Sequence, residues 1–288
     1  MEMKMVDISG KEDIPRMAIA EGCLVFEDIK ERKILDAALS LGRFTAIMTT
    51  KLAWRYMPFL HPIAITHIKT EYQKIDDNVL KLMTTAKTVA KTGVEMDVLF
   101  GTLMGLIASW AYLKMTTRAS IMIKGIRVVA KKKGISEEKA TRSGLNEVSI
   151  PVLNLSPRKP EERQSIVEGF IRLKPATLEL IAKGAVEKGD VVKVSRAVAV
   201  YMAKQADDLV PFIVDITVHH VEPYLELKKR GVRARVMVQG RGRGDVIIAA
   251  LISLGSLLLN VWDMVKPYEK DKRGLYPYTE IEYMREVL

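Results

Sequence analysis

The chain has 288 residues, of which 48% are hydrophobic, and a formal net charge of +10. A chain of this length and composition can bury a substantial core, which excludes a disordered chain, and a typical domain of about 150 residues predicts two units. The single cysteine, Cys23, excludes an internal disulfide framework and a zinc cluster of several thiolates, and it fits a reducing cytoplasm. The first eleven residues lack the apolar stretch of a signal peptide, so we expect a cytoplasmic protein.

In the first half, helical periodicity over residues 33–41 and 45–57 predicts two helices. Alternation over 63–70 predicts a strand, and a second strand is expected at 79–85. A long apolar helix follows at 98–113. Thr92 and Glu95 have the spacing of a capping box, which would be sufficient to explain the glutamate.

The second half repeats this order, with helices expected at 176–186 and 191–206, strands at 214–227 and 232–238, and an apolar stretch at 246–262. That stretch is at the short end of the range for a membrane-spanning helix, and it contains two serines, a glycine and an asparagine. We therefore expect a buried core helix and no membrane association.

Paired motifs recur in the same order in the two halves. They are Glu21-Gly22 with Glu168-Gly169, Pro58-Phe59 with Pro211-Phe212, and Trp110 to Lys114 with Trp262 to Lys266. This repetition predicts a tandem duplication, with one unit at 1–134, a linker and N-terminal arm at 135–165, and a second unit at 166–288. Helices packed twice on an antiparallel sheet give an α+β fold that forms a pseudo-dimer.

Several motifs resemble one known family. Residues 91–97 read Lys-Thr-Gly-Val-Glu-Met-Asp, residues 58–62 read Pro-Phe-Leu-His-Pro, and the segment from residue 5 to 16 is similar to the family's N-terminal segment. In the second half, residues 188–190 read Lys-Gly-Asp and residues 262–266 read Trp-Asp-Met-Val-Lys. These pieces resemble the cyclic pyranopterin monophosphate synthases (MoaC) of molybdenum-cofactor biosynthesis.

The resemblance implies two ferredoxin-like units, assembly as a trimer of pseudo-dimers, and active sites at the interface between units. The implied reaction is that of a lyase, which rearranges a cyclised dihydro-GTP into cyclic pyranopterin monophosphate with loss of pyrophosphate. The implied partner is therefore a GTP-derived small molecule. No metal site is expected, and no cofactor apart from Mg²⁺ that accompanies the triphosphate.

The resemblance also implies site residues. The catalytic candidates are Lys188, Asp263 and Lys266. Substrate-binding candidates, mostly cations for the triphosphate, are Lys11, Arg16, His61, Glu95, Asp97, Lys114, Lys131, Arg158 and Arg163. Without the resemblance, Asp263 and Lys266 would be an ordinary ion pair on one helix face, because they are three residues apart.

Each half lacks part of the family's set. In the first, Ala111 stands where the catalytic aspartate is expected and the Lys-Gly-Asp motif is deleted; in the second, Val214, Ile247 and Ala249 replace the histidine and two acids. We expect one pocket with Lys188, Asp263 and Lys266, completed by Lys11, Arg16 and Lys131. The opposite pocket would then hold His61, Glu95, Asp97 and Lys114, with Arg158 and Arg163.

Three functional hypotheses follow. The first is a fused enzyme of molybdenum-cofactor synthesis. The second is a catalytically inactive paralogue that binds a nucleotide or pterin, or acts as a regulatory or assembly subunit. The third is a basic nucleic-acid-binding protein, which is least favoured because net charge is an unspecific signal.

Overall fold

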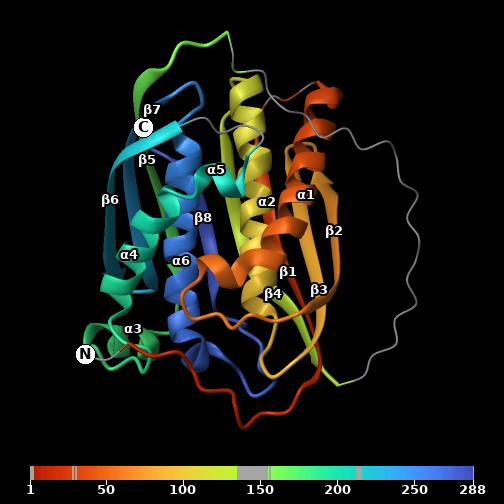
Figure 1. The fold of residues 1–288 in the computed structure, drawn as a ribbon, viewed down its shortest axis with the longest axis vertical. Coiled ribbons are helices and arrows are strands. Elements are labelled where there is room, and N and C mark those ends of the chain that lie inside the picture. The colour runs from red at the N-terminus through yellow and green to blue at the C-terminus, as the bar shows by residue number, and fades with distance from the viewer. Residues whose placement is uncertain are drawn as a thin grey trace.

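The computed structural model describes residues 3–27, 29, 31–134, 155, 157–211 and 216–287. Within this part of the chain, eight strands form one antiparallel sheet in the order β2-β3-β1-β4-β8-β5-β7-β6 (Figure 1). The strands are β1 (Ile14–Phe26), β2 (Ile65–Asp76), β3 (Val79–Ala90), β4 (Ile121–Lys133), β5 (Glu161–Arg172), β6 (Ile216–Lys228), β7 (Gly231–Gly242) and β8 (Glu280–Glu286).

The sheet order shows how the two halves meet. The first half contributes β2-β3-β1-β4 and the second half contributes β8-β5-β7-β6, which is the same order of equivalent strands read in reverse. The two central strands, β4 and β8, pair antiparallel across the junction. The two halves are therefore related by a pseudo-twofold axis, and the predicted α+β fold of two tandem ferredoxin-like units in a pseudo-dimer is confirmed.

The helices cover one face of this sheet (Figure 1). They are α1 (Arg32–Tyr56), α2 (Glu95–Thr116), α3 (Pro175–Ala182), α4 (Val191–Ala203), α5 (Ala206–Leu209) and α6 (Ile247–Glu269). The strands predicted at 79–85 and 232–238 lie within β3 and β7, and those predicted at 63–70 and 214–227 overlap β2 and β6. Val214 itself lies outside the described residues. Strand β5 begins at Glu161, inside the segment expected to be linker and arm, and the unit boundaries stay a prediction.

The prediction of two separate helices at 33–41 and 45–57 is wrong, because α1 runs through both without a break. At the point between them, Gly42 lets α1 approach α2 closely: a β-carbon there would lie 2.2 Å from the Ser109 hydroxyl. In the second half the corresponding helices are separate, because Gly184 and Gly189 adopt positive φ values of 63° and 110° between α3 and α4.

The capping box predicted at Thr92 is also wrong. Helix α2 begins at Glu95, its N-cap residue is Val94, and the N-cap side chain makes no capping hydrogen bond. The Glu95 carboxylate instead forms an ion pair with Lys131 of β4. The glutamate therefore links the start of a core helix to the sheet.

Helices α2 and α6 form the centre of the molecule. Both are long and apolar enough to cross a membrane, but the apolar stretch of each is entirely buried in the fold, so the core helix expected at 246–262 is confirmed. They lie side by side and run in opposite directions (Figure 1). At their contact, a β-carbon on Gly255 would lie 2.7 Å from a Leu103 methyl group. The N-terminus of α2 therefore lies beside the C-terminus of α6.

Candidate functional site

A cluster of ionisable side chains lies where the start of α2 meets the end of α6. Glu95 and Asp97 come from the first turn of α2, and Asp263 and Lys266 come from the last turns of α6. Glu95, Asp97 and Asp263 are buried. The charge of Lys266 acts on both α2 acids: it helps to lower the pKa of Glu95, and it opposes the burial that raises the pKa of Asp97. Acids from one half and a carboxylate–ammonium pair from the other thus belong to a single cluster.

Asp263 is held between two lysines. Its Oδ2 lies 2.7 Å from Lys188 Nζ and its Oδ1 lies 2.8 Å from Lys266 Nζ. Burial opposes ionisation of Asp263, but the ammonium groups of Lys266 and Lys188 outweigh it and keep the carboxyl pKa below its usual value. The side chains of Asp263 and Lys188 are only 1% and 4% exposed, so this arrangement is not the ordinary surface ion pair of the alternative interpretation.

Local backbone geometry explains how Lys188 enters the cluster. Gly189 turns the chain with a φ of 110°, and Asp190 caps α4 by accepting a hydrogen bond from the Lys193 amide. Lys188 Nζ also donates to the Asp263 carbonyl at 2.8 Å and lies 5.3 Å from the centre of the Phe59 ring. Because the ring belongs to the first half, the pocket is composite.

Burial opposes the ionised form of Glu95, but Lys131 and Lys266 outweigh it and lower the carboxyl pKa. Asp97 behaves differently: burial raises its pKa to about 7, and the charges of Glu95 and Asp263 add to the effect. Within the described residues, Asp97 Oδ1 has no hydrogen-bond partner. A buried carboxyl that titrates near neutrality is suited to proton transfer.

Sequence reasoning missed two neighbours of this cluster, Lys270 and Tyr276, which lie in the connection between α6 and β8. Burial and the nearby charge of Lys131 lower the pKa of Lys270 to about 8. Tyr276 is buried and packs edge-on against Trp262, with the two ring centroids 5.7 Å apart. Burial, together with the charges of Glu95 and Asp263, raises the pKa of Tyr276. The only sequence signal was the basic run that follows Lys266.

Three other first-half candidates lie on or contact the N-terminal segment, β1 and the loop before α2. Arg16 donates hydrogen bonds to the carbonyls of Ala90 and Lys91, at 2.7 and 2.9 Å, and so fixes the loop before α2. His61 Nε2 lies 2.9 Å from the Val6 carbonyl oxygen. Lys11 is exposed on the N-terminal segment.

The remaining candidates do not join the cluster. Lys114 lies in the last turn of α2 and forms an ion pair with Glu286 of β8 at 2.6 Å. Arg163 pairs with Glu161 at 2.8 Å, and Arg158 is exposed. The sequence assigned Glu95 and Asp97 to the same pocket as Lys114, which is wrong, because a helix rise of 1.5 Å per residue separates Glu95 from Lys114 by about 28 Å.

The opposite end of the α2–α6 pair is apolar where the first end is charged. Ile247 and Ala249 occupy the positions of Glu95 and Asp97, Ala111 occupies that of Asp263, and all three are fully buried. In the described part of the chain, no group of three histidine, cysteine, aspartate or glutamate side chains could hold a metal ion. The ionisable cluster is therefore confined to one of two pseudo-equivalent ends.

Comparison with known proteins agrees with the duplication. The sequence profile of the MoaC family matches residues 5–134 and again residues 152–285. A protein of Sulfurisphaera tokodaii named "Probable cyclic pyranopterin monophosphate synthase" is 36% identical over 134 residues, which cover 46% of this chain and 89% of the relative. Proteins with the same name from Aeropyrum pernix and Pyrococcus furiosus are 38% and 33% identical over 45% and 50% of this chain, and over 89% and 92% of their own lengths. Each relative thus corresponds to about half of the chain.

Proposed function

Because the chain belongs to the MoaC family, we propose that it is a cyclic pyranopterin monophosphate synthase with one active pocket per chain. The reaction would convert cyclised dihydro-GTP into cyclic pyranopterin monophosphate and release pyrophosphate. The observation that carries the proposal is the meeting of Glu95 and Asp97 with Lys188, Asp263 and Lys266 in one buried cluster. The two incomplete halves complement each other at this end.

In the proposed mechanism, Asp263 stays ionised and holds the ammonium groups of Lys188 and Lys266 in place, at 2.7 and 2.8 Å from its two oxygens. Ammonium groups fixed in a buried pocket stabilise negative charge that develops during ring opening. Asp97, with a pKa of about 7, exchanges the proton. Lys131 binds the phosphates, and it is positioned by its ion pair with Glu95.

The losses in the opposite pocket do not argue against this function. They motivated the alternative of an inactive paralogue that binds a nucleotide or pterin, or serves as a regulatory or assembly subunit. All of the replaced acids within the described residues lie at the apolar end of the α2–α6 pair, so they leave the charged end intact. One pocket is sufficient for turnover.

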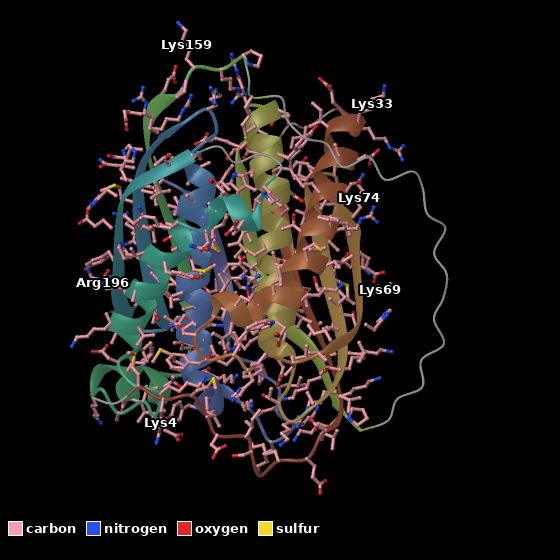
Figure 2. The ribbon with its side chains drawn as sticks, in the orientation of Figure 1. Lys4, Lys33, Lys69, Lys74, Lys159 and Arg196 are labelled. Atoms are coloured by element: carbon pink, nitrogen blue, oxygen red, sulfur yellow. The ribbon has the colours of Figure 1, made fainter. Side chains whose placement is uncertain are left out.

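The nucleic-acid hypothesis loses its support from the net charge. The basic residues labelled in Figure 2, which include Lys33, Lys69, Lys159 and Arg196, are exposed and point outward from opposite sides of the molecule. A nucleic-acid interface would gather such residues on one face. The cytoplasmic location, the trimer of pseudo-dimers and the absence of a cofactor other than Mg²⁺ stay predictions.

The deciding experiment compares two pseudo-equivalent lysines. The purified protein is incubated with enzymatically generated cyclised dihydro-GTP, and pyrophosphate release and the fluorescent oxidised pterin are followed. Lys266→Gln should lose product by at least about a hundredfold, because it removes a cation from the cluster. Lys114→Gln removes the same group at the apolar end and should keep activity within about twofold.

Absence of product from the unaltered chain, with substrate binding retained, would overturn the proposal and leave the inactive paralogue. Equal losses in the two variants would contradict the assignment of activity to one pocket.

A further inference from the structure

One buried hydroxyl group beside the ionisable cluster has no role in the mechanism proposed above. Tyr276 is only 3% exposed, and its ring packs edge-on against Trp262, which directly precedes Asp263 on α6. Within the part of the chain that the structure describes, the Tyr276 hydroxyl has no hydrogen-bond partner. A buried hydroxyl without a partner costs free energy, so an acceptor within its reach is expected.

The connection between α6 and β8 holds Tyr276 in this place. Glu269, in the last turn of α6, accepts a hydrogen bond from the Thr279 hydroxyl at 2.5 Å, which ties the start of the connection to its end. Between them, Gly274 turns the chain with a φ of 79°, and a β-carbon on Gly274 would lie 3.8 Å from Lys131 Nζ. The connection therefore lies against Lys131, and Tyr276 follows two residues after this contact.

The carboxylate of Glu95 is a group that needs a hydrogen-bond donor. Glu95 is buried, which opposes its ionisation, and its ion pair with Lys131 keeps the carboxylate charged. In the proposed mechanism, Lys131 binds the phosphates of the substrate, so its ammonium group turns away from Glu95. Removal of one partner from a buried ion pair is strongly unfavourable, because the other charge stays buried. Binding of substrate therefore calls for a replacement donor at Glu95.

Tyr276 has the properties of such a donor. Burial, together with the charges of Glu95 and Asp263, raises the pKa of Tyr276, so the phenol keeps its proton. Of these two carboxylates, Asp263 already accepts hydrogen bonds from two lysines, at 2.7 and 2.8 Å. Glu95 is therefore the carboxylate that would accept a hydrogen bond from the Tyr276 hydroxyl.

The apolar end of the α2–α6 pair lacks both groups. The connection between α2 and β4 comprises only residues 117–120, which include no tyrosine, and Ile247 stands at the position equivalent to Glu95. The buried tyrosine and the carboxylate thus occur together, at the end that carries the ionisable cluster.

We propose that Tyr276 is a positioning residue, whose hydroxyl donates a hydrogen bond to the Glu95 carboxylate when Lys131 leaves it for the substrate. This inference rests on the proposed function. The exchange of partners lowers the cost of releasing Lys131, because Glu95 keeps a donor. It stabilises the substrate complex and the transition state equally, so it acts on KM and not on kcat.

A double-mutant cycle in the full-length protein tests the exchange without substrate. Lys131→Gln removes the ammonium group from Glu95, and Tyr276→Phe removes only the hydroxyl, because the ring stays against Trp262. At pH 8, Tyr276→Phe should change the equilibrium constant of unfolding by less than about threefold in the original chain. In the Lys131→Gln chain it should raise that constant at least about tenfold, since a hydrogen bond to a charged group is lost. Chemical denaturation of the four proteins measures both values.

The matched control is Tyr112→Phe. Tyr112 is buried on α2, about 26 Å along the helix from Glu95. Its substitution should have the same effect on the unfolding equilibrium, within about twofold, with and without Lys131. Equal effects of Tyr276→Phe in the two backgrounds would overturn the proposal.

Steady-state kinetics provide a second readout, which remains available if Lys131→Gln does not fold. Tyr276→Phe should raise KM for cyclised dihydro-GTP at least about tenfold and keep kcat within about twofold. A merely structural defect would lower the fraction of active protein and therefore kcat. A lower kcat at unchanged KM would contradict the exchange.

Failure of this proposal can be told from failure of the proposed function. Energetic coupling between Tyr276 and Lys131 in a protein that forms no pterin would support the exchange at Glu95 and reject the activity. Formation of pterin with an unchanged KM in Tyr276→Phe would support the activity and reject the role of Tyr276.

Discussion

The two ends of the α2–α6 pair are equivalent in backbone and opposite in chemistry. At one end Glu95, Asp97, Asp263 and Lys266 are brought together; at the other, apolar residues fill the matching positions and Lys114 pairs with Glu286. In a dimer of identical subunits, any substitution appears in both pockets at once. In a tandem chain each pocket can change alone, so one can become apolar core while the other keeps its charges.

The first prediction concerns the centre of the charged end. Asp263→Asn removes the carboxylate that neutralises Lys188 and Lys266, so kcat/KM should fall on the order of a thousandfold. Leaving Lys188 buried without its partner should also cost about 3–5 kcal/mol in the free energy of unfolding. Turnover assays and chemical denaturation measure the two effects. A variant that is as stable and as active as the original chain would contradict the assignment of the active pocket to the charged end of the α2–α6 pair.

The second prediction uses the pH dependence of Asp97. Its folded-state pKa of about 7 exceeds the ordinary value of 3.8, so the folded state binds more protons and stability falls as pH rises from about 4 to about 7. The difference between a pKa of about 7 and the ordinary value of 3.8 corresponds to about 4 kcal/mol. Asp97→Asn should therefore be more stable than the original chain at pH 8, by up to that amount, and should lack the contribution of Asp97 to the pH dependence between 4 and 7.

Activity should move in the opposite direction. If ionised Asp97 accepts a proton, kcat/KM rises as the pH increases through 7. Asp97→Asn should then lose this rise with pH, and its rate should fall about a hundredfold. A variant that gains stability without losing activity would place the proton transfer elsewhere.

The sequence predicted the duplication and strands at the positions of β2, β3, β6 and β7. It also named Glu95, Asp97, Lys131, Lys188, Asp263 and Lys266 as site candidates, although in two different pockets. It missed the four central strands, β1, β4, β8 and β5. Strand β1, for example, is largely buried, so it lacks the clean alternation of an edge strand. The division of residues between pockets was wrong for a different reason. Helices α2 and α6 are apolar on every side, so periodicity does not show which helix end faces which.

Local sequence patterns also gave wrong or missing predictions where contacts between distant segments decide the structure. Thr92 and Glu95 have the spacing of a capping box, but Lys131 offers Glu95 an ion pair inside the fold. Lys270 and Tyr276 belong to no motif, and their place beside the cluster depends on how the connection after α6 folds back. Contacts of this kind depend on packing between distant segments, which a single sequence does not reveal.

The third prediction tests the turn that delivers Lys188. Gly189→Ala places a β-carbon at a φ of 110°, so it should cost about 1–3 kcal/mol of stability and displace Lys188 from Asp263. Activity should then fall by more than the fraction of unfolded protein accounts for. The control is Gly10→Ala, since a β-carbon on Gly10 would meet nothing within 4 Å.

The smallest expected effect compares two equivalent arginines. Arg16 and Arg163 occupy matching positions before the repeated Glu-Gly pairs, yet Arg16 donates two hydrogen bonds to carbonyls of the loop before α2, whereas Arg163 pairs with the exposed Glu161. Arg16→Gln should therefore lower the free energy of unfolding by about 1.5–3 kcal/mol, and Arg163→Gln by less than about 1 kcal/mol. Thermal unfolding of the two variants measures the difference. Equal losses of stability in the two variants would mean that Arg16 and Arg163 stabilise their halves to the same extent. The two halves would then differ only at the ends of α2 and α6.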